Sequence, residues 1–205
     1  MDDKSQYKFK TICFKENMHL KREKSNNIYL LQFLAENSNV NLYTMINLDI
    51  YNLMFTLNKD NFEKIELHGM VSTTLSSGSG SGSGSENKNI NEVNVLFLFK
   101  PFATDLGIKP KYMYVRVTEV CEPNKKTYNC VDVDYPNPEE LKNYDKVVNT
   151  ISSMVVNFES YHKINISYIF KIDLSHSLPV YMENIMGLIM KKVFLNLKQF
   201  IELIH

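Results

Sequence analysis

The end of the chain constrains the fold most, because a strand-like segment there runs directly into a long amphipathic helix. Ser177 is a suitable N-cap, and Pro179 falls in the first turn, where its missing N–H costs nothing. Met182, Met186 and Met190 crowd the first half of the helix, and their flexible thioethers suit a surface that fits variable apolar shapes. The pattern is also typical of an ordinary helix packed on a sheet. Apolar residues recur at spacings of three and four at Leu178, Met182, Ile185, Met186, Ile189, Val193, Leu197, Phe200 and Ile204.

The rest of the chain consists of clustered strands with two helical segments among them. Alternating polarity and turn residues predict strands over 7–14, 19–24, 28–35, 93–99, 112–121, 127–133, 151–160 and 164–172. Spacings of three and four predict helices over 44–57 and 60–67. Because the strands follow one another without crossover helices, we expect an α+β fold with an antiparallel sheet and a C-terminal helix.

Length and charge limit the classes of function. The 205 residues suffice for one core, so we expect a single domain over 1–205. Lys and Arg total 23, and Asp and Glu total 23, so no overall field favours nucleic acid, and we expect no nucleic-acid partner. No apolar run reaches the ~18 residues of a membrane span. The acidic residues 1–4 are unlike a signal peptide, so a secreted or lumenal location would require a leader that was removed.

Residues 76–85 contain only serine and glycine, which is typical of an engineered flexible linker. We expect this segment to replace a longer native loop. The chain is rich in Asn, Lys, Ile, Tyr and Phe and has seven Gly and no Trp. This composition suggests an AT-rich genome of the malaria-parasite type, in which low-complexity loops are common.

Motifs for catalysis and for metal binding are missing from the sequence. It contains no G-x-S-x-G elbow, no phosphate-cradling glycine loop and no H-E-x-x-H or C-x-x-C spacing. We therefore expect no catalytic residue, no metal and no cofactor. Cys121 and Cys130 flank a turn-like segment, and the sequence leaves open whether they form a disulfide bond or remain free thiols.

The strands carry more large apolar residues than two short helices can cover. These residues predict either a solid core or an internal cavity with a few polar groups, and the sequence does not separate the two. They include Phe97, Phe99, Met113, Met154, Phe158, Tyr168 and Phe170.

The stretch from Ile166 to Phe200 resembles the end of a START domain, the family of steroidogenic-acute-regulatory-related lipid-transfer modules. The resemblance rests on a strand ending in Ile172-Asp173-Leu174, a short polar turn, and Leu178-Pro179 at the start of a long terminal helix. It implies a helix-grip fold, in which a curved antiparallel β-sheet wraps on the C-terminal α-helix and encloses a lipid cavity.

The same resemblance implies a function. It indicates a monomeric, non-enzymatic lipid-transfer protein that binds one phospholipid and moves it between membranes through transient contacts, with a sterol as the alternative ligand. A lipid-sensing or protein-interaction module on the same fold is the second hypothesis. An enzyme of the wider helix-grip superfamily is the third.

The resemblance also implies a lid. Residues 100–110 are bounded by prolines and match the family's omega loop by position. This match would bring Phe102, Ala103 and Leu106 against the methionines of the terminal helix and make their seam the entrance for lipid. The alternative is an ordinary connection between strands.

Arg116 is similar by position to the arginine that the family places in its cavity. It shares a strand face with Tyr112 and Tyr114, and its forked donors suit a lipid phosphate. The family's Arg-Asp pair is replaced by Lys111-Tyr112, so an exposed Arg116 is the alternative. The expected lipid-binding residues are Phe102, Ala103, Leu106, Tyr112, Tyr114, Arg116, Met154, Phe158, Tyr168, Phe170, Met182, Ile185, Met186, Ile189, Met190 and Val193.

Overall fold

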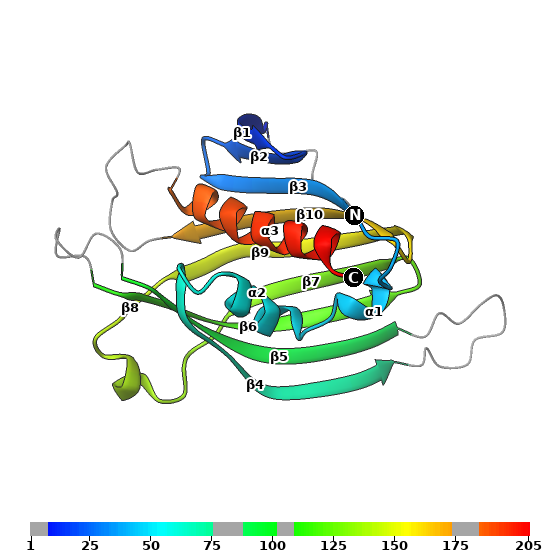
Figure 1. Cartoon of the computed structure of the whole chain (residues 1–205). Helices are drawn as coiled ribbons and strands as arrows, with labels where there is room; N and C mark the ends of the chain where they lie inside the picture. Colours follow the sequence, from blue (N-terminus) through cyan, green and yellow to red (C-terminus); the bar gives the residue numbers. More distant parts are fainter. Residues whose placement is uncertain (1–7, 76–87, 102–108, 174–184) are drawn as a thin grey trace.

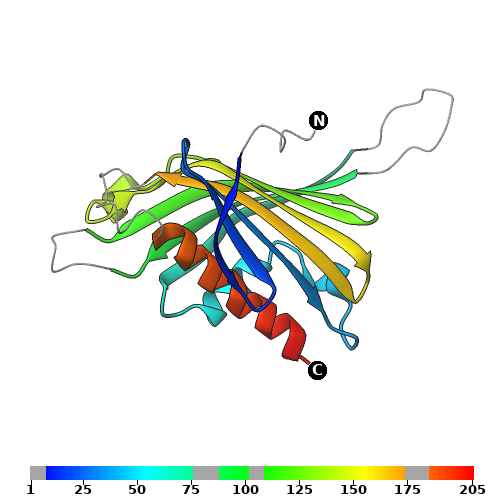
Figure 2. The same ribbon diagram turned by 90° about the horizontal axis from the view of Figure 1, so that it is seen from above.

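A computed structural model describes residues 8–75, 88–101, 109–173 and 185–205, and one curved sheet dominates it (Figure 1). The strands are β1 (Lys10–Lys15), β2 (Met18–Glu23), β3 (Ile28–Glu36), β4 (Phe62–Leu75), β5 (Lys88–Phe99), β6 (Lys111–Glu122), β7 (Lys125–Asp132), β8 (Asp145–Lys146), β9 (Val148–Ser160) and β10 (Lys163–Asp173). The helices are α1 (Leu42–Met45), α2 (Ile50–Leu57) and α3 (Ile185–Leu203), with a short 3-10 helix over Pro138–Leu141. Helices α2 and α3 lie on the same face of the sheet (Figure 2).

The strands are hydrogen-bonded in the order β1-β2-β3-β10-β9-β7-β6-β5-β4. Neighbours in this order run antiparallel, and the short β8 pairs in parallel with β6. Strand β10 lies between β3 and β9, so the N-terminal strands and the central strands form one sheet. The expected antiparallel α+β fold is confirmed.

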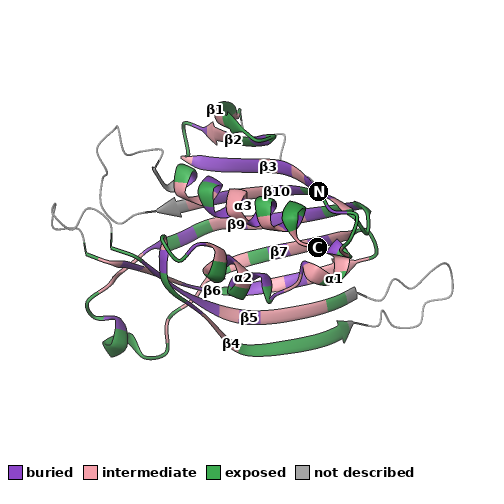
Figure 3. Cartoon of the chain, viewed as in Figure 1, coloured by how far each residue is buried: buried purple, intermediate pink, exposed green. Residues whose placement is uncertain are grey.

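Side chains alternate between the two faces of the sheet, and one face carries the main core. In β9, Met154, Val156 and Phe158 are buried, and the residues between them are more exposed (Figure 3). This alternation is the two-residue period of a strand that is covered on one side.

Helix α3 covers the core because one of its sides is apolar. Val193, Leu197 and Ile201 on this side have no exposed surface. The Phe194 ring lies 5.1 Å from the Tyr168 ring of β10, measured between centroids. The helix therefore packs directly against the middle of the sheet.

Asparagine side chains attach the second half of α3 to its neighbours. The Asn37 amide donates to the backbone oxygens of Ile201 (2.6 Å) and Ile204 (2.7 Å), which satisfies carbonyls that a helix end leaves unpaired. The Asn196 amide donates to the Leu57 oxygen (3.2 Å) at the end of α2. These bonds connect α3 to the segment after β3 and to α2.

The helix predicted over 44–57 is two helices in the structure. The Asn41 side chain caps α1 by accepting a hydrogen bond from the Tyr43 N–H. Ile46 has an extended backbone that ends α1. The Asn47 side chain then accepts a hydrogen bond from the Asp49 N–H (2.7 Å), and this Asx turn redirects the chain into α2.

The helix predicted over 60–67 is wrong, because residues 60 and 61 form a turn and β4 begins at Phe62. Phe62 pairs with Phe99, whereas Lys64 pairs with Leu98, so β4 holds one extra residue at this point. The resulting β-bulge turns Phe62 and Ile65 toward the same core, although they are three residues apart. The bulge therefore produces a spacing that resembles a helix.

The serine-glycine segment falls in 76–87, outside the described residues, so its engineered origin stays a prediction. Its flanking residues Leu75 and Lys88 are paired, and the segment therefore joins two neighbouring strands. Among the described residues, no helix is long and apolar enough to cross a membrane.

Cys121 and Cys130 are free thiols and do not form the disulfide bond that the sequence left open. In the ladder between β6 and β7, Cys121 pairs with Lys126, and Cys130 pairs with Val117. The two cysteines are therefore not opposite each other.

Candidate binding cavity

An apolar cavity of about 50 Å³ lies between the sheet and helices α2 and α3. Small-molecule sites usually measure roughly 300–1,000 Å³, so a lipid fits here only if lining side chains move. The lining residues are Ile50, Tyr51, Met54, Phe62, Phe97, Phe99, Met113, Val115, Tyr128, Cys130, Asn149, Ser152, Met154, Tyr168, Met190 and Phe194.

Four methionines from four different elements line this cavity. Met54 lies on α2, Met113 on β6, Met154 on β9 and Met190 on α3. Methionine is unbranched and has three rotatable bonds, so it changes shape more readily than a β-branched side chain. The lining is therefore tightly packed, but its methionine side chains can rearrange around a ligand.

The polar groups of the lining are uncharged. Ser152 and Tyr168 share a hydrogen bond between hydroxyl oxygens 3.1 Å apart, and the Tyr51 hydroxyl lies 3.8 Å from the Cys130 sulfur. Burial raises the pKa of the Tyr51 and Tyr168 hydroxyls and of the Cys130 thiol, so all three stay protonated at neutral pH.

Asn149 contributes an amide that has no partner in the described part of the chain. The residue is 4% exposed, and neither its side-chain nitrogen nor its side-chain oxygen forms a hydrogen bond there. Buried amides are normally paired, so an unpaired one in a cavity wall is exceptional.

A β-bulge explains why Asn149 points inward. Ile151 pairs with Lys171, whereas Asn149 pairs with Ile172, so Thr150 is an extra residue in β9. Without it, residues 149 and 152 would lie on opposite faces, because a strand alternates with a period of two. The bulge brings Asn149 onto the same face as Ser152, and bulges often redirect a side chain in this way near functional sites.

A buried ionic group on β6 and β7 holds α1 and the residue that follows it, Ile46. The Lys126 ammonium donates to the backbone oxygens of Tyr43 (2.8 Å) and Ile46 (2.6 Å) and lies 3.9 Å from the Glu119 carboxylate. The Tyr128 hydroxyl donates to that carboxylate at 2.7 Å. Burial and the Glu119 charge raise the pKa of Tyr128, which therefore stays a donor.

The structure brings several predicted site residues to this core. Met154, Tyr168 and Met190 line the cavity itself. Phe158, Phe170 and Val193 are buried in the surrounding core, and Ile189 packs against it.

Tyr112, Tyr114 and Arg116 do share a strand face, but it is the face that points away from the cavity. Tyr112 and Tyr114 belong to a separate apolar cluster with Leu96 and Leu141, and Arg116 is exposed, with its Nε 3.5 Å from the Asn94 side-chain oxygen. The expectation that these three residues line the cavity is therefore wrong, and Arg116 has the exposed position that the sequence left as the alternative. Alternation predicts which residues share a face, but the neighbouring elements decide which face is covered.

Other expectations fall on parts of the chain that the structure does not describe. Phe102, Ala103, Leu106 and Met182 lie outside the described residues, as do the side chains of Ile185 and Met186. The proposed entrance between the loop and the terminal helix stays a prediction for the same reason.

Sequence reasoning missed Asn149, Ser152 and Cys130 in the cavity wall. The strand was expected to begin at Ile151, so Asn149 fell in the preceding loop. A usable signal was Val147, an apolar residue two positions before Asn149, which is fully buried in the structure.

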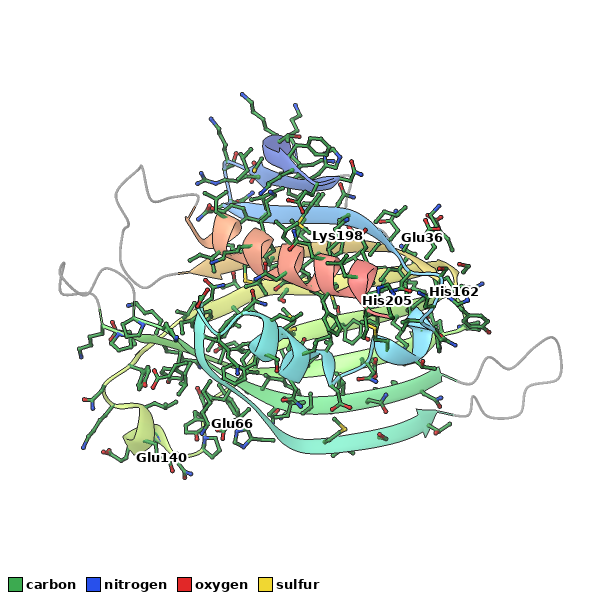
Figure 4. The ribbon with its side chains drawn as sticks, in the orientation of Figure 1. Glu36, Glu66, Glu140, His162, Lys198 and His205 are labelled. Carbon is green, nitrogen blue, oxygen red and sulfur yellow. The ribbon has the colours of Figure 1, made fainter. Side chains whose placement is uncertain are left out.

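No charged residue is among the described residues that line the cavity, although Glu119 accepts a hydrogen bond from the lining residue Tyr128. Six residues are labelled in Figure 4, and none of them lines the cavity. They are Glu36 at the end of β3, Glu66 on β4, Glu140 in the 3-10 helix, His162 between β9 and β10, Lys198 on α3 and His205 at the end of the chain. Within the described ranges, no group of three or more His, Cys, Asp or Glu side chains could hold a metal ion.

Comparisons with known proteins identify the fold. No protein-family model and no curated protein matches the chain. The human StarD13 lipid transfer and protein localization domain aligns with a TM-score of 0.66 and 12% identity, over 98% of this chain and 92% of that chain. Human StAR-related lipid transfer protein 5 aligns with a TM-score of 0.62 and 13% identity, over 94% of this chain and 86% of that chain. Human STARD10 aligns with a TM-score of 0.61 and 9% identity, over 94% of this chain and 72% of that chain. The chain has the helix-grip fold of the START domains.

Proposed function

We propose that this protein binds one lipid between the sheet and α3 and carries it between membranes without changing it chemically. The observation that carries the proposal is the cavity, which is walled by large apolar side chains and has only uncharged polar groups. The names of StAR-related lipid transfer protein 5 and of the StarD13 domain, which share the fold, add support.

The physical task of such a carrier is to keep acyl or ring carbons out of water. Exposure costs about 0.8 kcal/mol per CH₂, so a sixteen-carbon tail costs on the order of 10 kcal/mol. A wall built from aromatic rings and methionines removes most of this barrier. The small volume of about 50 Å³ means that methionine rotamers must change as the lipid enters.

The sequence favoured a phospholipid because of Arg116, Tyr112 and Tyr114. Arg116 is exposed and both tyrosines belong to a separate cluster, which removes that support. No cation lines the described cavity wall, so a phosphate there would have no charged partner. We propose that the buried end of the lipid is uncharged.

A cavity-filling substitution tests the function. Met113→Trp places a bulkier ring in the cavity, and we expect it to reduce lipid transfer between vesicles by about tenfold or more. Met70→Trp is the matched control, because Met70 is 54% exposed on β4 and should leave transfer unchanged. Equal transfer by wild type and a folded Met113→Trp variant would place the lipid elsewhere.

The same assay separates a carrier from a lipid sensor. A carrier moves many lipids per protein molecule from donor to acceptor vesicles, whereas a sensor retains the first lipid that it binds. Native mass spectrometry of the purified protein identifies the bound lipid in either case.

A further inference from the structure

We propose that Asn149, Ser152 and Tyr168 form a hydrogen-bonding subsite for a hydroxyl group, so that the lipid is a neutral one with a free hydroxyl at its buried end. This inference rests on the proposed function and adds the class of ligand. All three residues line the cavity, and each is buried or partly buried.

The first argument is the unpaired amide of Asn149. Both its nitrogen and its oxygen lack a hydrogen-bond partner among the described residues, and 4% of the residue is exposed. An unpaired buried amide destabilises a fold, and the bulge at Thr150 directs this one into the cavity. A sequence that served stability alone would have an apolar residue here.

The second argument concerns which group can satisfy this amide. The Asn149 oxygen needs a donor, and the nitrogen needs an acceptor. An ester carbonyl can only accept, whereas a hydroxyl both donates and accepts. Ser152 also hydrogen-bonds with the Cys130 thiol. When the Ser152 O–H donates to Tyr168, the Tyr168 O–H remains for a further acceptor and can complete the contacts of a hydroxyl.

The third argument excludes a charged group at this position. The described wall contains no Lys, Arg or His to pair with a phosphate. Burial of an ionised group without a partner is strongly unfavourable, whereas a hydroxyl needs only hydrogen bonds. Sterols and diacylglycerols both carry such a hydroxyl, and an experiment distinguishes the two sources.

The test measures extraction of defined lipids from phosphatidylcholine vesicles. Each vesicle sample contains cholesterol, dioleoylglycerol or the O-methyl ether of either, and mass spectrometry quantifies the lipid retained by the separated protein. We expect one hydroxyl lipid to be extracted about tenfold or more better than its methyl ether. The two pairs of lipids show whether the hydroxyl belongs to a sterol or to a glyceride.

The variant Asn149→Leu should abolish this preference without lowering the midpoint of urea unfolding, because it removes an unpaired amide. Asn165→Leu is the matched control, because Asn165 is exposed on β10, and it should keep the preference. Tyr168→Phe removes one hydroxyl and should reduce the preference independently. If Asn149→Leu does not fold, the preference of Tyr168→Phe for the hydroxyl lipid over its methyl ether tests the subsite.

Three results overturn the inference, and they have two different consequences. Extraction of phosphatidylcholine or of the methyl ethers as efficiently as the hydroxyl lipids contradicts the subsite and leaves lipid transfer intact. A preference that survives in Asn149→Leu or in Tyr168→Phe has the same consequence. Extraction of no lipid at all contradicts the proposed function itself.

Discussion

At the scale of single residues, Lys126 shows how a buried charge positions a helix over the sheet. Its ammonium is bound to two backbone oxygens of the α1–α2 segment and lies over the Tyr43 ring, 4.5 Å from the centroid. Glu119, which is 2% exposed, supplies the opposite charge. The backbone oxygens of a helix end gain a donor that no apolar residue could provide.

Replacement of Lys126 should therefore be costly. We expect Lys126→Met to lower the free energy of unfolding by about 3–5 kcal/mol, because it leaves Glu119 buried without a counter-charge. The double variant Lys126→Met/Glu119→Gln should recover part of the loss. Urea unfolding measures both.

The neighbouring Lys125 is the control for this experiment. It pairs with Glu122 at 3.7 Å, and its side chain is 45% exposed. We expect Lys125→Met to change the free energy of unfolding by no more than about 1 kcal/mol. Equal losses for Lys125→Met and Lys126→Met would show that the buried pair has no special role.

At the scale of elements, the sequence predicted most strands and the terminal helix, because long periodic segments carry a strong pattern. Two of its failures fall where a bulge interrupts a strand. The bulge in β4 places Phe62 and Ile65 at a helical spacing, and the bulge in β9 places Asn149 and Ser152 at the same spacing. A bulge depends on the partner strand, so one segment read alone cannot reveal it.

The contact between α3 and β3 was also hidden from the sequence. A Cβ atom added at Gly187 would lie 2.5 Å from the nearest atom of the Tyr29 ring. That ring is 1% exposed and stacks on Phe170 with centroids 5.2 Å apart, so it has little room to move. Gly187 therefore allows α3 to approach the sheet closely.

Gly187→Ala tests this contact. Alanine favours a helix over glycine by about 1 kcal/mol, yet we expect the clash with Tyr29 to lower the free energy of unfolding by about 1–3 kcal/mol. Leu188→Ala, at an exposed neighbouring position, should have little effect. In a Tyr29→Leu background the penalty of Gly187→Ala should disappear, and a penalty that persists there would contradict the contact. Urea unfolding of the wild type and of the four variants measures these differences.

At the scale of the whole molecule, the cavity is lined from α2, α3 and six strands, β4, β5, β6, β7, β9 and β10. Strands β1 and β2 lie at the edge of the sheet and contribute nothing to the described wall (Figure 1). The resemblance at the C-terminus predicted this architecture, but it could not predict the size of the cavity. The volume depends on how side chains from distant segments pack together.

Lipid binding should therefore stabilise most of the molecule at once. At a lipid concentration 100-fold above the dissociation constant, mass action raises the free energy of unfolding by about 2.7 kcal/mol. We expect amide hydrogen exchange to slow in the segments that line the cavity, which are 50–54, 113–115, 128–130 and 149–154. Exchange in β1 and in 72–74 should change least, because these segments do not line it.

The pattern of protection distinguishes an internal lipid from one on the surface. Met113→Trp serves as the control, because its filled cavity should show no added protection when the same lipid is present. If protection instead appears in the exposed half of β4, where Met70 and Val71 are more than half exposed, the lipid binds on the outside of the sheet. Protection in the lining segments of the wild type, together with its loss in Met113→Trp, requires that the core itself opens to admit the lipid.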